Sequence, residues 1–123
     1  MYAAGLDGGG TKTTAAIADA TGRIVRTVTA GPINYNGNDE KVVEQSFQRI
    51  FDAIRETCGT LDACAHLCIG AAGVSNPDVR SRMLRTVQSC GYRNGVTIVG
   101  DHETALFGAH GRPHGIVLIS GTG

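Results

Sequence analysis

The chain has 123 residues, of which 41% are hydrophobic and 18% are charged, a balance typical of a globular domain with a buried core. Eleven basic residues balance eleven acidic ones, so nothing favours nucleic acid or an anionic membrane surface as a partner. Apolar stretches are too short to span a bilayer and no secretory signal is visible. We therefore expect no membrane partner and a cytoplasmic location.

The first thirty residues predict three short strands. They cover Tyr2–Leu6, Thr13–Ala18 and Arg23–Thr29, and tight turns join them, as in an antiparallel meander. Gly31-Pro32 ends the meander, and a loop over Ile33–Gly37 follows.

A long helix is predicted between Asn38 and Gly59. Asn38 can cap its N-terminus, Asp39 and Glu40 place negative charge in its first turn, and Gly59 is a typical stop. Apolar residues at helical spacing form its inner face: Val43, Phe47, Ile50, Phe51 and Ile54.

Strands and helices alternate in the rest of the chain. Strands are predicted over His66–Ala71, Val96–Val99 and Gly115–Ile119, and a short helix over His102–Ala109. Another helix opens at Asn76-Pro77, with a cap and a proline at its first position. It stops at Gly91, and its predicted inner face is Val79, Met83, Leu84 and Val87.

This order, β-β-β-α-β-α-β-α, predicts an α/β domain in which a mixed five-stranded sheet carries helices on both faces. It is similar to the ribonuclease-H-like half of actin-like ATPases. We expect residues 1–112 to form this N-terminal lobe. Residues 113–123 would then be the first strand and phosphate turn of a truncated second lobe.

A glycine-rich turn, Asp7 to Thr13, follows the first strand. Glycine lets backbone amides approach a phosphate closely, while hydroxyls and a lysine add donors. The groups expected to contact phosphate are Gly8, Gly9, Gly10, Thr11, Lys12 and Thr13. Asp7 would hold Mg²⁺ through water, because this ion keeps several waters and takes few carboxylates.

A strand follows this turn, so it is neither a Walker A loop nor a dinucleotide turn, both of which open a helix. A glycine-rich hairpin that binds no ligand is the alternative. Ser120-Gly121-Thr122-Gly123 repeats the pattern after the last predicted strand, which makes Gly121 and Thr122 further phosphate-binding candidates.

Asp101 comes just after the strand over Val96–Val99, at the sheet edge where α/β proteins bind ligands. A carboxylate there can accept the proton of an attacking sugar hydroxyl, although an N-cap for the next helix explains it equally well. Gly73 belongs to a run of small residues that leaves room beside Asp101. Asn34 can hydrogen-bond a sugar hydroxyl, or can simply be a turn residue.

The four cysteines, Cys58, Cys64, Cys68 and Cys90, include no CxxC pair and no zinc-type spacing. We expect buried or incidental thiols.

Several motifs together resemble one known family. They are Leu6–Thr13, Gly31–Tyr35, Gly70–Val74, Asp101 and Val117–Gly123. In this order they look like the N-terminal half of the BadF/BadG/BcrA/BcrD ATPase family, and within it the N-acetylglucosamine kinase branch.

The resemblance implies that Thr11 and Thr122 contact ATP. It also implies that Asn34 and Asp101 contact the sugar and that Asp101 is the catalytic base. Because closure of two lobes assembles such sites, this fragment is expected to bind ATP weakly and to be inactive by itself.

The favoured function is ATP-dependent phosphorylation of an amino sugar, with N-acetylglucosamine as acceptor, ATP and Mg²⁺ as cofactors, and a homodimer formed through the second lobe. One alternative is an activator ATPase that couples hydrolysis to electron transfer into a dehydratase or reductase. The other is a non-catalytic, ATP-binding regulator.

Overall fold

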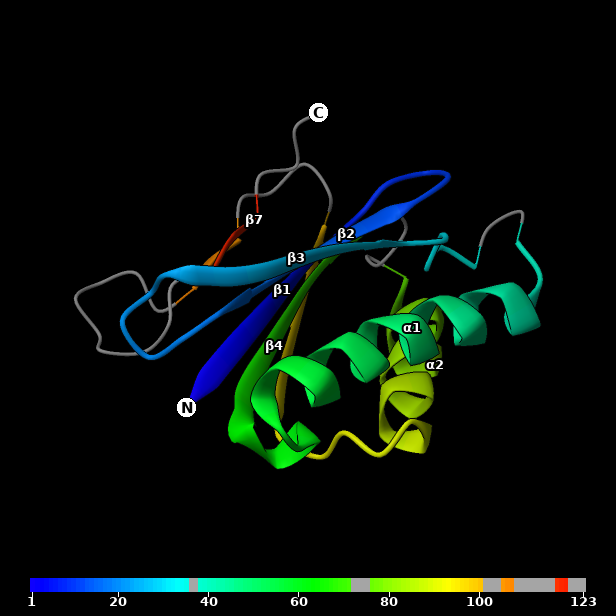
Figure 1. The fold of residues 1–123 in the computed structure, drawn as a ribbon. Helices are drawn as coiled ribbons and strands as arrows, with labels where there is room; N and C mark the ends of the chain where they lie inside the picture. The colour runs from blue at the N-terminus through cyan, green and yellow to red at the C-terminus, as the bar shows by residue number, and fades with distance from the viewer. Residues whose placement is uncertain (36–37, 72–75, 101–104, 108–116, 120–123) are drawn as a thin grey trace.

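The computed structural model describes residues 1–35, 38–71, 76–100, 105–107 and 117–119. Within these residues, neither helix is long and apolar enough to cross a membrane. Figure 1 shows a twisted sheet with two helices packed against it. The elements in chain order are β1 (Tyr2–Gly8), β2 (Thr13–Ala18), β3 (Ile24–Ala30), α1 (Glu40–Cys58), the 3₁₀ turn η1 (Leu61–Ala63), β4 (Cys64–Ala71), α2 (Pro77–Ser89), β5 (Gly95–Gly100), β6 (Ala105–Phe107) and β7 (Val117–Ile119).

The first five strands form one mixed sheet in the order β3-β2-β1-β4-β5. Strands β1, β2 and β3 pair antiparallel, whereas β4 pairs parallel to β1 and β5 parallel to β4. Parallel neighbours require crossover connections, which α1 and α2 supply. The predicted mixed five-stranded sheet is therefore confirmed, with strand bounds shifted by one or two residues.

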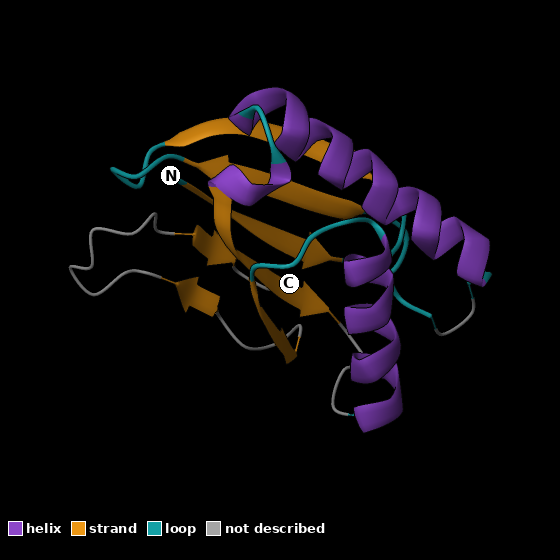
Figure 2. Cartoon of the chain, turned by 90° about the horizontal axis from the view of Figure 1, so that it is seen from below, coloured by secondary structure: helices purple, strands orange, loops and turns teal. Residues whose placement is uncertain are grey.

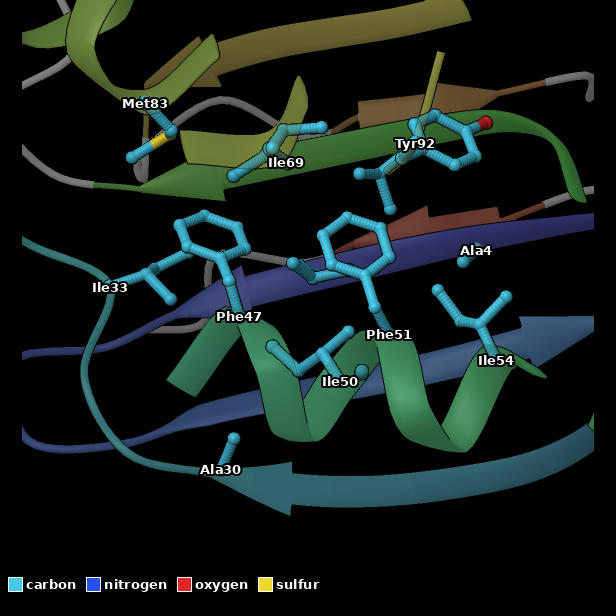
Figure 3. Close-up of a cluster of buried hydrophobic side chains, with 14 of the residues drawn as sticks. Ala4, Ala30, Ile33, Phe47, Ile50, Phe51, Ile54, Ile69, Met83 and Tyr92 are labelled. Atoms are coloured by element: carbon cyan, nitrogen blue, oxygen red, sulfur yellow. The ribbon is translucent and has the colours of Figure 1, made fainter. Parts of the chain in front are cut away.

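Helix α1 buries the predicted apolar face, and its five predicted core residues are fully buried. Figure 3 shows Phe47 and Phe51 projecting from α1 toward residues of the sheet and of the loop after β3. The helix ends at Gly59, whose φ of 92° suits glycine. Its start differs from prediction, because Asp39 occupies the N-cap position without a side-chain cap bond. Asn38 is therefore not the cap.

Helix α2 starts as predicted. The side chain of Asn76 accepts a hydrogen bond of 2.8 Å from the backbone N–H of Asp78, and Pro77 is the first helical residue. Met83 and Val87 are buried, but Leu84 is 37% exposed, so its predicted place on the inner face is wrong. One residue along a helix turns the side chain by about 100°, which carries Leu84 away from the direction of Met83.

Both described helices lie on one face of the sheet, not on two as predicted. Residues of α1, α2 and alternate strand positions form a single core cluster, and we call this the helix-covered face. The opposite face carries a small cluster of Ala3, Ala18 and Cys68, with Val99 packed against it. Strand β7 lies against β1 and β2, and Figure 2 shows the β6–β7 pair on the side away from the helices.

The helix predicted over His102–Ala109 is wrong for residues 105–107, which form strand β6. This strand pairs antiparallel with β7. Local propensity is easily overridden by pairing with a distant segment, and the partner here follows later in the chain. The other residues of the predicted helix lie outside the described residues.

Candidate active site at one edge of the sheet

The strand ends that carry the predicted site residues are aligned in one row across the sheet. Gly8 lies opposite Thr13 on one side and Ala71 on the other. Thr13 in turn lies opposite Ala30, and Ala71 opposite Gly100. Neighbouring strands are about 4.8 Å apart, so Gly8 and Gly100, two strands apart, are separated by roughly 10 Å. This row, Ala30–Thr13–Gly8–Ala71–Gly100, is called the edge row below.

The glycine-rich turn leaves the sheet at this edge as a hairpin between β1 and β2. The backbone N–H of Gly9 donates a hydrogen bond of 2.8 Å to the carbonyl of Lys12, so this amide is used within the turn. Residues 9–12 are all exposed. The amides of Gly10 and Thr11, the Thr11 hydroxyl and the Lys12 ammonium group are consequently the groups that an anionic ligand can reach.

The three consecutive glycines have different surroundings. A Cβ atom at Gly8 would lie 2.9 Å from Cγ1 of Ile33 and 3.2 Å from the carbonyl oxygen of Gly70. At Gly9 it would lie 3.2 Å from the Lys12 carbonyl oxygen, and at Gly10 it would meet nothing within 4 Å. Gly8 is therefore a packing residue, whereas the lack of a side chain at Gly10 matters only to a molecule approaching from solvent.

Asp7 and Thr13 point to opposite faces of the sheet, because side chains alternate along a strand. Asp7 is an even number of residues from Ala3 in β1, so it lies on the opposite face with Ala3, where it is half-buried. Thr13 has the parity of Ala15 and Ile17 on the helix-covered face and is completely buried. Its hydroxyl has no hydrogen-bond partner among the described residues. The Thr13 hydroxyl therefore faces the core in this structure, and its predicted contact with a phosphate stays a prediction.

Asp7 is the described carboxylate at the end of β1, next to the turn. No group of three His, Cys, Asp or Glu side chains within the described part of the chain could hold a metal ion. A single half-exposed carboxylate still fits Mg²⁺, which commonly takes one or two carboxylates and completes its shell with water and substrate phosphates. The donor chemistry at Asp7 therefore agrees with a phosphate-bound Mg²⁺ and not with an all-protein cage.

The loop after β3 leaves the sheet at the same edge and carries Asn34. Ile33 is fully buried in the main core and Tyr35 is 9% exposed, so both neighbours of Asn34 are anchored. The carbonyl of Asn34 accepts a hydrogen bond of 2.8 Å from the side-chain amide of Asn38. Asn38 therefore binds the backbone of the Asn34 loop and does not cap the helix as predicted.

Two cysteines and a histidine lie in β4, outside the glycine-rich turn. Burial raises the pKa values of Cys64 and Cys68 to about 11, so both thiols stay protonated at neutral pH, in agreement with the prediction of buried thiols. His66, near the start of β4, shares a contact of 2.9 Å with the hydroxyl of Thr97. Burial lowers the pKa of His66.

Four predicted site residues lie outside the described residues: Gly73, Asp101, Gly121 and Thr122. Their nearest described neighbours are Ala71, Gly100 and Ile119. Two of these, Ala71 and Gly100, belong to the edge row. Sequence reasoning missed the anchoring residues Ile33 and Tyr35, although their apolar character next to Asn34 was a usable signal.

This sheet, its two crossover helices and its strand order define a ribonuclease-H-like fold. Two solved structures share the fold. One is a Porphyromonas gingivalis protein provisionally assigned as an N-acetylglucosamine kinase, with a TM-score of 0.65 and 20% identity, covering 80% of this chain and 34% of that one. The other is RuvC of Thermus thermophilus, with a TM-score of 0.50 and 12% identity, covering 82% of this chain and 62% of that one.

Residues 4–123 match the BadF/BadG/BcrA/BcrD ATPase family, and the chain belongs to this family. It is also 33% identical, over 123 residues, to the N-acetylmuramic acid/N-acetylglucosamine kinase of Clostridium acetobutylicum. That alignment covers 99% of this chain and 40% of the relative. The chain therefore spans less than half the length of this curated relative.

Proposed function

We propose that this chain is the N-terminal lobe of an ATP-dependent kinase that phosphorylates an amino sugar such as N-acetylglucosamine. The observation that carries the proposal is the edge row, since the glycine turn and the Asn34 loop leave the sheet there and β5, the strand before Asp101, ends there. The kinase relative at 33% identity supports an amino sugar as the acceptor.

The exposed turn is the proposed binding site for the phosphates of ATP. Amides of Gly10 and Thr11 would donate to phosphate oxygens, and Lys12 would offset their negative charge. Bound at Asp7 through water, Mg²⁺ would neutralise charge on the phosphates. Gly121 and Thr122 would supply a second phosphate turn if residues 113–123 begin a second lobe, as the sequence predicts.

The acceptor sugar is proposed to bind beside the turn, between Asn34 and Asp101, with Gly73 leaving space for the ring. Asp101 would accept the proton of the attacking hydroxyl. The hydroxyl oxygen then bonds to the γ-phosphorus, the bond from that phosphorus to the β–γ bridging oxygen breaks, and ADP leaves. Such a transfer depends mainly on positioning and charge neutralisation, which a site built from backbone amides can provide.

The test is an ADP-release assay with the complete protein in which this chain occurs, against a panel of amino and neutral sugars. We expect stimulation by an amino sugar, and its loss in Asp101→Asn with nucleotide binding nearly unchanged. Asp62→Asn is the matched control. It makes the same chemical change just before β4, at the opposite edge of the sheet from the end of β5. Near-normal turnover in Asp101→Asn would remove Asp101 from the mechanism.

The same assay separates the alternative functions. ADP release that no sugar stimulates, together with iron–sulfur absorbance, would favour an activator ATPase. Nucleotide binding without hydrolysis would favour a regulator. Dimerisation through a second lobe and a cytoplasmic location stay predictions.

A further inference from the structure

A group of four side chains ties the Asn34 loop to both helices. The Tyr35 hydroxyl lies 2.6 Å from Oγ1 of Thr86 in α2. The guanidinium carbon of Arg82 lies 4.4 Å from the centre of the Tyr35 ring, within the range of a cation–π interaction. Arg82 also forms an ion pair of 2.7 Å with Glu40 at the start of α1. We call Tyr35, Glu40, Arg82 and Thr86 the Tyr35 clasp.

The direction of the hydrogen bond between Tyr35 and Thr86 follows from the second contact of Thr86. Its hydroxyl donates to the carbonyl of Arg82 at 3.0 Å, and a hydroxyl has only one hydrogen to donate. Tyr35 is therefore the donor to Thr86. Desolvation raises the pKa of Tyr35, which keeps this donor protonated at physiological pH.

The clasp lies at the edge of the main core, because Tyr35 is a buried member of that cluster, whereas Arg82 and Glu40 lie at its rim. The side chains of Arg82 and Glu40 are 43% and 60% exposed, and exposed ion pairs contribute little to global stability. Most of the core cluster is built from other residues, such as Phe47 and Phe51. Loss of the clasp should consequently loosen the loop locally and leave the sheet and helices folded.

The clasp holds one side of Asn34, and two other contacts hold the rest of the loop. Ile33, the preceding residue, is packed against Gly8 of the edge row, and the Asn34 carbonyl is bound by Asn38. With both neighbours fixed, the backbone at Asn34 has little freedom to turn, so its position relative to the glycine turn is set.

We propose that the Tyr35 clasp is a positioning device for the acceptor sugar, in which Arg82 and Tyr35 hold Asn34 at the edge row without touching the substrate. This inference rests on the proposed function. Misplacement of a binding group by about 1 Å can cost up to 10²-fold. We therefore expect loss of the clasp to raise the KM for the sugar by about tenfold, with little change in kcat or in the KM for ATP.

The experiment compares Arg82→Ala and Tyr35→Phe in the complete protein with Arg85→Ala as the matched control. Arg85 is an exposed arginine of the same helix, and its removal changes the net charge equally. Arg82→Ala is expected to raise the sugar KM selectively and to leave the thermal midpoint near that of the unmodified protein. Arg82→Lys, which keeps the charge over the ring, should restore part of the affinity.

Backbone hydrogen exchange at residues 33–35 gives a readout that does not depend on turnover. We expect faster exchange there in Arg82→Ala than in Arg85→Ala. If the unmodified protein phosphorylates no sugar, the proposed function fails. Hydrogen exchange then still tests whether the Tyr35 clasp fixes the backbone at Asn34. An unchanged sugar KM, a parallel rise in the KM for ATP, or unchanged exchange at residues 33–35 would overturn the inference.

Discussion

Ile33 packs directly onto Gly8, so the loop that carries Asn34 and the turn that carries the exposed glycines share one contact. The closest approach leaves no room for a methyl group, because a Cβ atom at Gly8 would lie 2.9 Å from Cγ1 of Ile33. The two segments proposed to bind sugar and nucleotide therefore cannot move independently at this point.

Gly8→Ala should lower the stability of the fold, whereas Gly10→Ala should leave stability nearly unchanged and weaken nucleotide binding. Overpacking in a filled core costs about 1–3 kcal/mol, so Gly8→Ala is expected to lower the free energy of unfolding by that amount. Gly10 has no neighbour within 4 Å of an added Cβ atom and no positive φ. Gly10→Ala should therefore change stability by less than about 1 kcal/mol.

Nucleotide titration completes this comparison. Gly10→Ala places a methyl group where a phosphate would approach, so it should weaken ATP binding despite its normal stability. Urea denaturation of the two variants measures the change in stability, and ATP titration measures the change in nucleotide affinity. Equal stability of the two variants would show that Ile33 can shift at little cost.

Thr13→Val should stabilise the fold, since the Thr13 hydroxyl is buried without a partner among the described residues. An unsatisfied buried polar group costs about 1–3 kcal/mol, and valine keeps nearly the same shape. We expect the free energy of unfolding to rise by about 1 kcal/mol. ATP titration of the same variant tests the predicted contact of this hydroxyl with a phosphate. Thr14→Val, at a half-buried neighbour, is the control, and a clear fall in stability for Thr13→Val would reveal a hidden partner of the hydroxyl.

Alkaline pH should destabilise the fold through two thiols. Burial raises the pKa values of Cys64 and Cys68 from 9.0 to about 11, so above pH 9 the unfolded chain loses these protons first. Their contribution to stability is complete below pH 9 and is lost as pH rises toward 11. Urea denaturation between pH 8 and 11 should show this fall, and a Cys64→Ala/Cys68→Ala variant should show a shallower one. Equal slopes would contradict the raised pKa values.

Asp7→Asn should change the Mg²⁺ requirement of the proposed kinase. The variant keeps the shape of the side chain but removes the charge at the end of β1, so the Mg²⁺ concentration for half-maximal ADP release should rise. Binding of ATP without metal should not weaken, because repulsion between carboxylate and phosphate is also removed. Asp62→Asn is the control. An unchanged Mg²⁺ dependence would place the metal away from Asp7.

Local patterns in the chain were sufficient to predict several parts of the fold. The 3.6-residue spacing of apolar residues predicted the buried face of α1, and Asn76-Pro77 and Gly59 predicted helix ends. These signals depend on residues close together in sequence, where backbone preference and capping act directly. The glycine turn was predicted for the same reason.

Tertiary structure decided the features that depend on distant partners. Thr13 and Gly8 turned out to face the core because register with Ala30 and Ala71 fixes the faces of their strands, and β6 formed because β7 pairs with it. Arg82 meets Tyr35 only after α2 has packed beside α1. A sequence can thus specify which groups are available for binding, whereas the packing of strands and helices decides which of them face a ligand and which support it.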